Sequence, residues 1–96
     1  MSKIYKYALT KFRHGVENHI LMNKGAQLLA FKIQYERLDP FPVIWALTDN
    51  SRVDDTVLRT FILHFTGDSV SEGDMYLGTD IDNIGLVWHC FERYNV

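Results

Sequence analysis

The residues in this sequence best suited to chemistry are four histidines and one cysteine, Cys90, which directly follows His89. A thiol beside an imidazole acts as a nucleophile only where the imidazole can reach its proton. Neighbouring residues of a β-strand point to opposite faces of the sheet, so His89 and Cys90 are not expected to form a dyad. We therefore predict that Cys90 is a buried structural cysteine and assign no catalytic residue.

The histidines lack the spacing of a metal site. His14, His19, His64 and His89 show no His-x-x-x-His pattern. His64 and His89 could meet only if their strands were neighbours in a matching register. In that case the favoured interpretation is a hydrogen-bonded histidine lining a pocket, and we predict neither a metal nor a cofactor.

Two other motifs resemble binding loops and fail on inspection. The run 80–85 resembles the start of a calcium loop, but Phe91 stands at the twelfth position, where that loop requires a bidentate glutamate. The run 66–69 lacks the Gly-Lys-Ser/Thr ending of a phosphate-binding loop. We interpret the first run as a hairpin turn and the second as an ordinary loop.

The two tryptophans, Trp45 and Trp88, lie in apolar segments and allow two interpretations. Both rings could pack in the core, or they could form stacking walls for a planar ligand in one shared site. In the second case His64 and His89 would orient the ligand, and Arg59 would pair with a phosphate. These five residues are the predicted ligand-binding set.

Length and composition indicate one β domain over residues 1–96. With 47% hydrophobic residues the chain can form a core, and a net charge of −2 provides no general field for DNA, RNA or an anionic membrane. A single cysteine fits a reducing compartment. No run approaches the ~18 apolar residues of a membrane span, and the N-terminal segment is not typical of a secretory signal. We expect a cytoplasmic protein.

The hydrophobic pattern has the period of two that is typical of strands. It places Leu29, Phe31, Ile33 and Tyr35 on one face, and an equivalent alternation runs from 61 to 65. Both prolines, at 40 and 42, are expected in a loop before a strand. The polar segment 49–57 has room for one short helical turn. The predicted strands are 4–9, 16–22, 26–36, 43–48, 58–66, 75–77 and 84–92, and they favour an all-β fold, a small antiparallel sandwich or barrel.

Two predicted strands, 43–48 and 84–92, carry apolar residues on both faces. Val87 and Phe91 point away from Leu86 and Trp88, so the last strand is either central between packed layers or part of a subunit interface. The short chain favours the interface, and we predict a homo-oligomer, most simply a two-fold dimer.

Several sequence blocks occur in the same order along nearly the whole chain: IYKY at 4–7, GA at 25–26, IWALTD at 44–49, RTF at 59–61, TG at 66–67, YLGT at 76–79 and LVWHCFE at 86–92. Together they resemble a family of small phage and prophage proteins with no established activity. The chain departs from that pattern at 22–24 and at 65–68, where the family tends to have Met-Pro and Gly-Thr-Gly-His. The resemblance implies a phage origin, a host-cell location and a compact β fold.

These observations favour a non-catalytic binding protein over an enzyme. Such a protein could counter host defence by sequestering a nucleotide-derived signal or by binding a host protein, and it would need affinity and abundance without turnover. The alternatives are a small enzyme with a histidine-containing pocket and a virion or other structural interaction protein. No DNA, RNA or membrane partner is expected.

Overall fold

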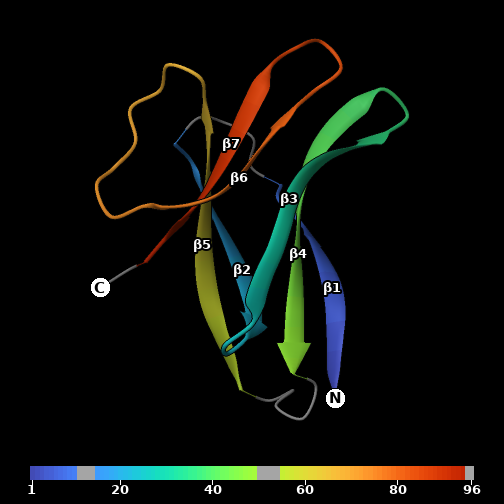
Figure 1. Cartoon of the computed structure of the whole chain (residues 1–96), viewed down its shortest axis with the longest axis vertical. Coiled ribbons are helices and arrows are strands. Elements are labelled where there is room, and N and C mark those ends of the chain that lie inside the picture. The colour runs from blue at the N-terminus through green and yellow to red at the C-terminus, as the bar shows by residue number, and fades with distance from the viewer. Residues whose placement is uncertain (11–14, 50–54, 95–96) are drawn as a thin grey trace.

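The computed structural model describes residues 1–10, 15–49 and 55–94. The all-β prediction is confirmed, and none of these ranges contains a helix of the length and apolarity that would cross a membrane. The helical turn considered for 49–57 falls mainly on residues outside the described ranges, as does His14. The strands are β1 (Ser2–Ala8), β2 (Glu17–Asn23), β3 (Gln27–Glu36), β4 (Asp39–Asp49), β5 (Thr56–Phe65), β6 (Met75–Ile81) and β7 (Val87–Arg93) (Figure 1).

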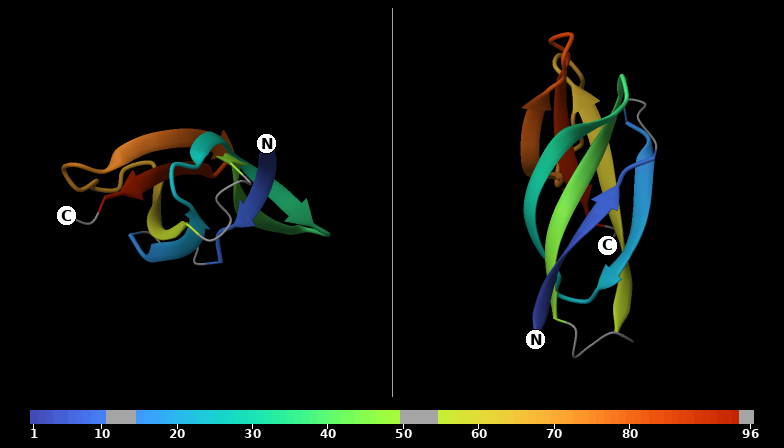
Figure 2. Two further views of the ribbon diagram at one scale, coloured as in Figure 1. Left: turned by 90° about the horizontal axis from the view of Figure 1, so that it is seen from below. Right: turned by 90° about the vertical axis from the view of Figure 1, so that its right-hand side faces the viewer.

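The strands form two antiparallel sheets that pack as a sandwich, one of the two architectures that the sequence favoured. Sheet A has three strands in the order β1-β4-β3, and sheet B has four in the order β2-β5-β7-β6 (Figure 2). The inward faces of both sheets supply the core. Its buried residues include Leu9, Met22, Phe31, Ile33, Ile44, Ala46, Phe61, Leu63, Trp88 and Cys90.

The prediction that both prolines precede the strand is wrong, because Pro40 and Pro42 lie within β4 and face Tyr35 and Ile33 of β3. The amide N–H of Leu9 donates to the carbonyl of Pro42, so the polar backbone edge of Pro42 points towards β1. Residues two apart in a strand share this direction. The missing N–H groups therefore face the side where β1 ends, and the ladder with β3 stays intact.

A β-bulge modifies the predicted alternation in β3. Phe31 and Ile33 face the core as expected, but the register with β4 shifts between Leu28 and Ala30. The extra residue, Leu29, is 43% exposed, and Leu28 packs against the core in its place. One inserted residue reverses the facing of all residues before it, which a simple period of two does not anticipate.

The edge strands β3 and β6 lie beside each other and close one side of the sandwich (Figure 1). A Cβ atom on Gly78 would lie 3.2 Å from the Cβ of Phe31, so glycine permits this close approach. Further along, the amide of Ile33 donates to the Asp80 carboxylate at 2.8 Å. This side of the sandwich therefore has contacts that join the two sheets directly.

The last strand begins at Val87, later than predicted, because the turn before it lies at 82–85. On its outer face, the ring of Phe91 meets the rings of His64 and Tyr76 edge-on, with centroids 5.5 and 5.7 Å apart. The apolar character of Phe91 is thus accounted for within the chain. It does not require a partner subunit, and the oligomeric state stays a prediction.

Candidate functional site

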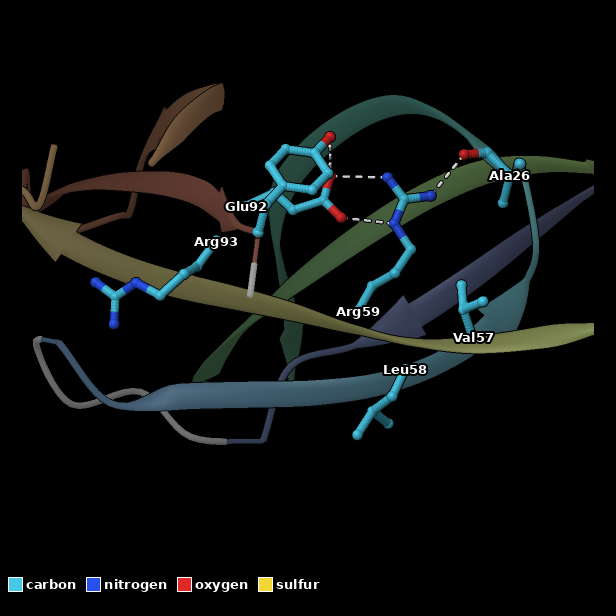
Figure 3. A pocket seen from close by; sticks show the side chains of 8 residues that line it. Ala26, Val57, Leu58, Arg59, Glu92 and Arg93 are labelled. Atoms are coloured by element: carbon cyan, nitrogen blue, oxygen red, sulfur yellow. Dashed lines mark hydrogen bonds and ion pairs between the residues drawn. The ribbon is translucent and has the colours of Figure 1, made fainter. Parts of the chain in front are cut away.

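The structure does not bring the five predicted ligand-binding residues to one place. Trp45 lies on the outer face of sheet A, because its neighbours in β4 face the core. Trp88 lies in the core, while His64 and His89 lie on the outer face of sheet B. Arg59 lies on the inner side of β5, near one end of the sandwich (Figure 3). The expectation that both tryptophans share a site is therefore wrong.

Trp88 is a core residue whose polar atom is satisfied within the chain. Its ring is 5% exposed and its indole Nε1–H donates to Oδ2 of Asp82 at 2.9 Å. The other carboxylate oxygen of Asp82 accepts the amides of Ile84 and Leu86, which organises the turn into β7. These bonds, the indole bond first, hold the pKa of Asp82 below its ordinary value.

His64 and His89 do meet, because β5 and β7 are neighbours and the two residues are direct cross-strand partners. Nδ1 of His89 lies 2.9 Å from Oγ1 of Thr79, and Nε2 lies 3.1 Å from Oγ1 of Thr66. Tyr76 extends this series of hydrogen bonds, because its hydroxyl lies 2.7 Å from Oγ1 of Thr79. Either tautomer of the imidazole fits, because hydroxyl groups both donate and accept.

A cavity of about 310 Å³ adjoins this pair under the loop that follows β5. His89 thus lines this cavity and has a hydrogen-bond partner at each ring nitrogen, and the ligand-binding role of the two histidines stays a prediction. The lining residues are His64, Phe65, Thr66, Gly67, Asp68, Val70, His89 and Phe91.

Arg59 takes part in the most strongly bonded polar group between the sheets. Its Nε and Nη2 donate to the two carboxylate oxygens of Glu92 at 2.6 and 2.7 Å, and Nη1 donates to the carbonyl of Ala26 at 2.6 Å (Figure 3). The Tyr94 hydroxyl donates to Oε1 of Glu92 at 3.2 Å. Ala26 lies in the turn between β2 of sheet B and β3 of sheet A, so this group fixes that connection to the inner side of sheet B.

Two cavities, of about 380 and 280 Å³, meet at this ion pair. They share Arg59, Glu92 and Tyr94, and we call them together the Arg59 cleft. The first is also lined by Gly25, Ala26, Val57, Leu58 and Arg93, and the second by Leu28, Met75, Tyr76 and Leu77.

The cleft has little net charge despite its two arginines. The hydrogen bond that Arg59 donates to Glu92 raises the pKa of Arg59, and the bond that Arg93 donates to Asp74 raises the pKa of Arg93. Arg93 contacts Asp74 through two bonds of 2.9 Å. A phosphate at Arg59 would therefore have to compete with the buried carboxylate of Glu92, which the sequence-based assignment of Arg59 did not include.

The sequence does contain a signal for Glu92. Arg59 shares strand parity with the core residues Phe61 and Leu63, and Glu92 shares parity with Cys90. Opposite charges on core-facing positions require a partner, because an isolated buried charge is costly. Within the described ranges, His, Cys, Asp and Glu form no group of three that could hold a metal ion.

The fold and the cleft define a class of protein: a small two-sheet antiparallel sandwich with a polar cleft between its layers. The chain belongs to the family described as Domain of unknown function (DUF7352), whose match spans residues 1–96. Comparison with curated proteins and with solved structures found no match.

Proposed function

We propose that this protein is a non-catalytic binding protein that holds a small molecule in the Arg59 cleft. The observation that carries the proposal is the fork of Arg59 and Glu92, placed where two cavities meet between the sheets. Its donors and acceptors stand in a place that is partly shielded from water, where directional bonds give specificity.

The chemistry of the cleft favours a planar ligand with adjacent hydrogen-bond donors and acceptors, such as a nucleobase. Among the described residues, the hydrogen bonds of Arg59 use three of its five N–H groups. The remaining donors and the carboxylate of Glu92 offer a mixed edge to such a ligand. Tyr94 is 56% exposed beside them and supplies an aromatic surface.

A nucleotide-derived signal has this chemistry, and sequestering it would be enough to counter a host defence. The resemblance to phage proteins supports this role, as does the cytoplasmic location expected from the single cysteine. A host protein that inserts a side chain into the cleft is the other candidate partner.

A thermal-shift screen with mono-, di- and cyclic nucleotides tests the proposal. A ligand at 100 times its Kd adds about 2.7 kcal/mol to stability. We expect Tyr94→Ala to lose that shift and Tyr5→Ala, which changes an exposed tyrosine of sheet A, to keep it. A screen without any shift, or equal shifts in both variants, would refute the cleft as a nucleotide site.

The histidine pocket supports a second candidate, a small hydrolase. Oγ1 of Thr66 lies 3.1 Å from Nε2 of His89, the distance expected of a nucleophile and its base, and Thr79 orients the imidazole. Turnover of an activated ester by the wild type, abolished in Thr66→Val and His89→Gln and retained in Tyr94→Ala, would support this function. Equal rates in all four proteins would exclude it.

A further inference from the structure

The four edge strands of the two sheets are protected to different degrees. Unpaired backbone groups along a sheet edge are ready to pair with another strand unless charge, proline or a covering element prevents it. β3 and β6 cover each other through the contacts of Gly78 and Asp80. β1 carries Lys3 and Lys6. β2 is different, because its sequence ENHILMN contains neither lysine nor proline, and its one charged residue, Glu17, stands at its first position.

The outward backbone groups of β2 can be identified from its register with β5. The amide of Lys24 donates to the carbonyl of Asp55, which extends the β2/β5 pairing by one residue. Residues two apart point the same way, so the even-numbered backbone groups of β2 face β5. Those of His19 and Leu21 face outwards, at an edge where β2 pairs with no other strand of the described ranges.

Two exposed leucines lie side by side on the outer face next to this edge. Leu21 is 61% exposed and stands directly opposite Leu58 of β5, which is 62% exposed. Both lie on the outer face of sheet B, and Figure 3 shows Leu58 on the opposite side of β5 from Arg59. On the inner face, Ile20 is half-buried and packs against the core.

We propose that β2 is a dimerisation edge, on which β2 of a second copy of this chain pairs antiparallel about a two-fold axis at Ile20. In this register His19 of each copy faces Leu21 of the other, and their outward N–H and C=O groups form four hydrogen bonds. Glu17 then faces Asn23 of the other copy, so no like charges oppose each other. The result is a continuous eight-stranded sheet.

The self-complementary register favours a second copy over a different strand, because Glu17 meets the uncharged Asn23 and Ile20 meets its own equivalent. Ile20 meets its own equivalent in the close, non-hydrogen-bonded position, where two β-branched side chains pack well. Each Leu21 joins its own Leu58 and the imidazole of the facing His19 in one stripe. This interface lies on a different part of sheet B from Val87 and Phe91. Leu58 lies at its border with the Arg59 cleft, while Arg59, Glu92 and Tyr94 lie outside the interface.

Analytical ultracentrifugation of matched variants tests the edge. Ile4 in β1 is 62% exposed, so Leu21→Lys and Ile4→Lys place the same charge on equally exposed edge positions of the two sheets. We expect the wild type and Ile4→Lys to sediment as dimers of the 11.2 kDa chain, and Leu21→Lys as a monomer of unchanged circular dichroism. A monomeric wild type at about 100 µM, roughly a hundredfold above a micromolar Kd, would overturn the proposal, as would dissociation by Ile4→Lys and not by Leu21→Lys.

Amide hydrogen exchange provides a second readout that does not depend on a mutation. The N–H groups of Ile20 and Met22 face β5 and should be protected at every protein concentration. Those of His19 and Leu21 should gain at least tenfold protection as concentration rises through the dimer range. Fast exchange at His19 and Leu21 in a sample that sediments as a dimer would place the interface elsewhere.

Discussion

The inner face of sheet B and the outer face of sheet A each carry a tryptophan and a bridging cation, yet these groups have different surroundings. On sheet B, Trp88 donates to Asp82 in the core, and Arg59 bonds Glu92 at a site that is partly shielded from water. On sheet A, Trp45 is half-buried on a face open to solvent.

The bridge across sheet A runs from Nζ of Lys6 to Oε1 of Gln34, 3.1 Å away, and is exposed. An exposed contact exchanges one set of hydrogen bonds for another with water, so its net contribution is small. A buried contact has no such replacement when one partner is lost. The residue types in a contact therefore say little about its contribution to the free energy of unfolding. That contribution depends on whether water can replace the contact.

The largest difference between the two regions should come from breaking the two bridges. We expect Glu92→Leu to lower the free energy of unfolding by about 3–5 kcal/mol, because it leaves the Arg59 guanidinium uncompensated at a buried site. Lys6→Met should change it by less than about 0.5 kcal/mol. Urea denaturation measures both.

The double variant Arg59→Met with Glu92→Leu separates charge from packing. Replacing a whole buried ion pair by apolar residues of similar volume is often close to neutral. We expect the double variant to recover most of the free energy of unfolding that Glu92→Leu loses. A double variant as unstable as the single one would show that the bond to Ala26, and not the charge, is what matters.

The second largest difference in stability is expected between variants of the two tryptophans. Trp88→Phe removes the indole donor from Asp82 and should cost about 1–3 kcal/mol, the range for a buried partner left unsatisfied. Trp45→Phe keeps an aromatic ring on a half-exposed face and should cost under about 1 kcal/mol. Thermal unfolding compares them, and equal shifts in Tm would contradict the distinction between the two faces.

Acid should weaken the region around Trp88. The pKa of Asp82 is lowered in the folded chain, so its stabilisation is present above the unfolded carboxyl value of 3.8 and is lost as pH falls through the lower folded value. Asp82→Asn should therefore flatten the decline of unfolding free energy below about pH 4. Trp88→Phe removes the largest cause of the shift and should flatten it partly.

Cys90 should show the smallest effect near neutral pH. Burial raises its pKa from 9.0 to about 12, so the thiol stays protonated in the folded chain. Its contribution to stability is complete below pH 9 and declines towards pH 12, because the unfolded thiol ionises first. At pH 8 iodoacetamide should modify Cys90 in urea and hardly at all in the native protein. Fast native alkylation would mean that the core of sheet B opens readily.

Strand periodicity predicted the architecture well where side-chain alternation is uninterrupted. Phe61, Leu63 and Phe65 face the sandwich interior together, as expected. The errors arose where backbone geometry departs from the repeat: at the bulge that displaces Leu29, and at Pro42, whose missing donor faces the end of β1. Neither the position of a bulge nor the direction of a missing N–H group follows from the alternation of apolar and polar side chains.

The candidate site was harder to predict because its parts come from distant segments. Arg59 and Glu92 are 33 positions apart, and only the register between β5 and β7 brings them to one end of the sandwich. Strand parity would have flagged both as inward-facing charges. Parity could not assign Trp45 to a face, because the predicted strand 43–48 is apolar on both faces. The sequence therefore did not show that Trp45 and Trp88 lie on different sides of different sheets.

Because the two indoles lie in different surroundings, the intrinsic fluorescence of the protein can report on two of its regions. Trp88 lies in a dry core beside a carboxylate, and its emission should be shifted to shorter wavelengths than that of the half-exposed Trp45. Excitation at the red edge would select Trp45, and acrylamide would quench it first. Fluorescence could thus follow events on the surface of sheet A and in the interior of sheet B separately, in one sample and without an added dye.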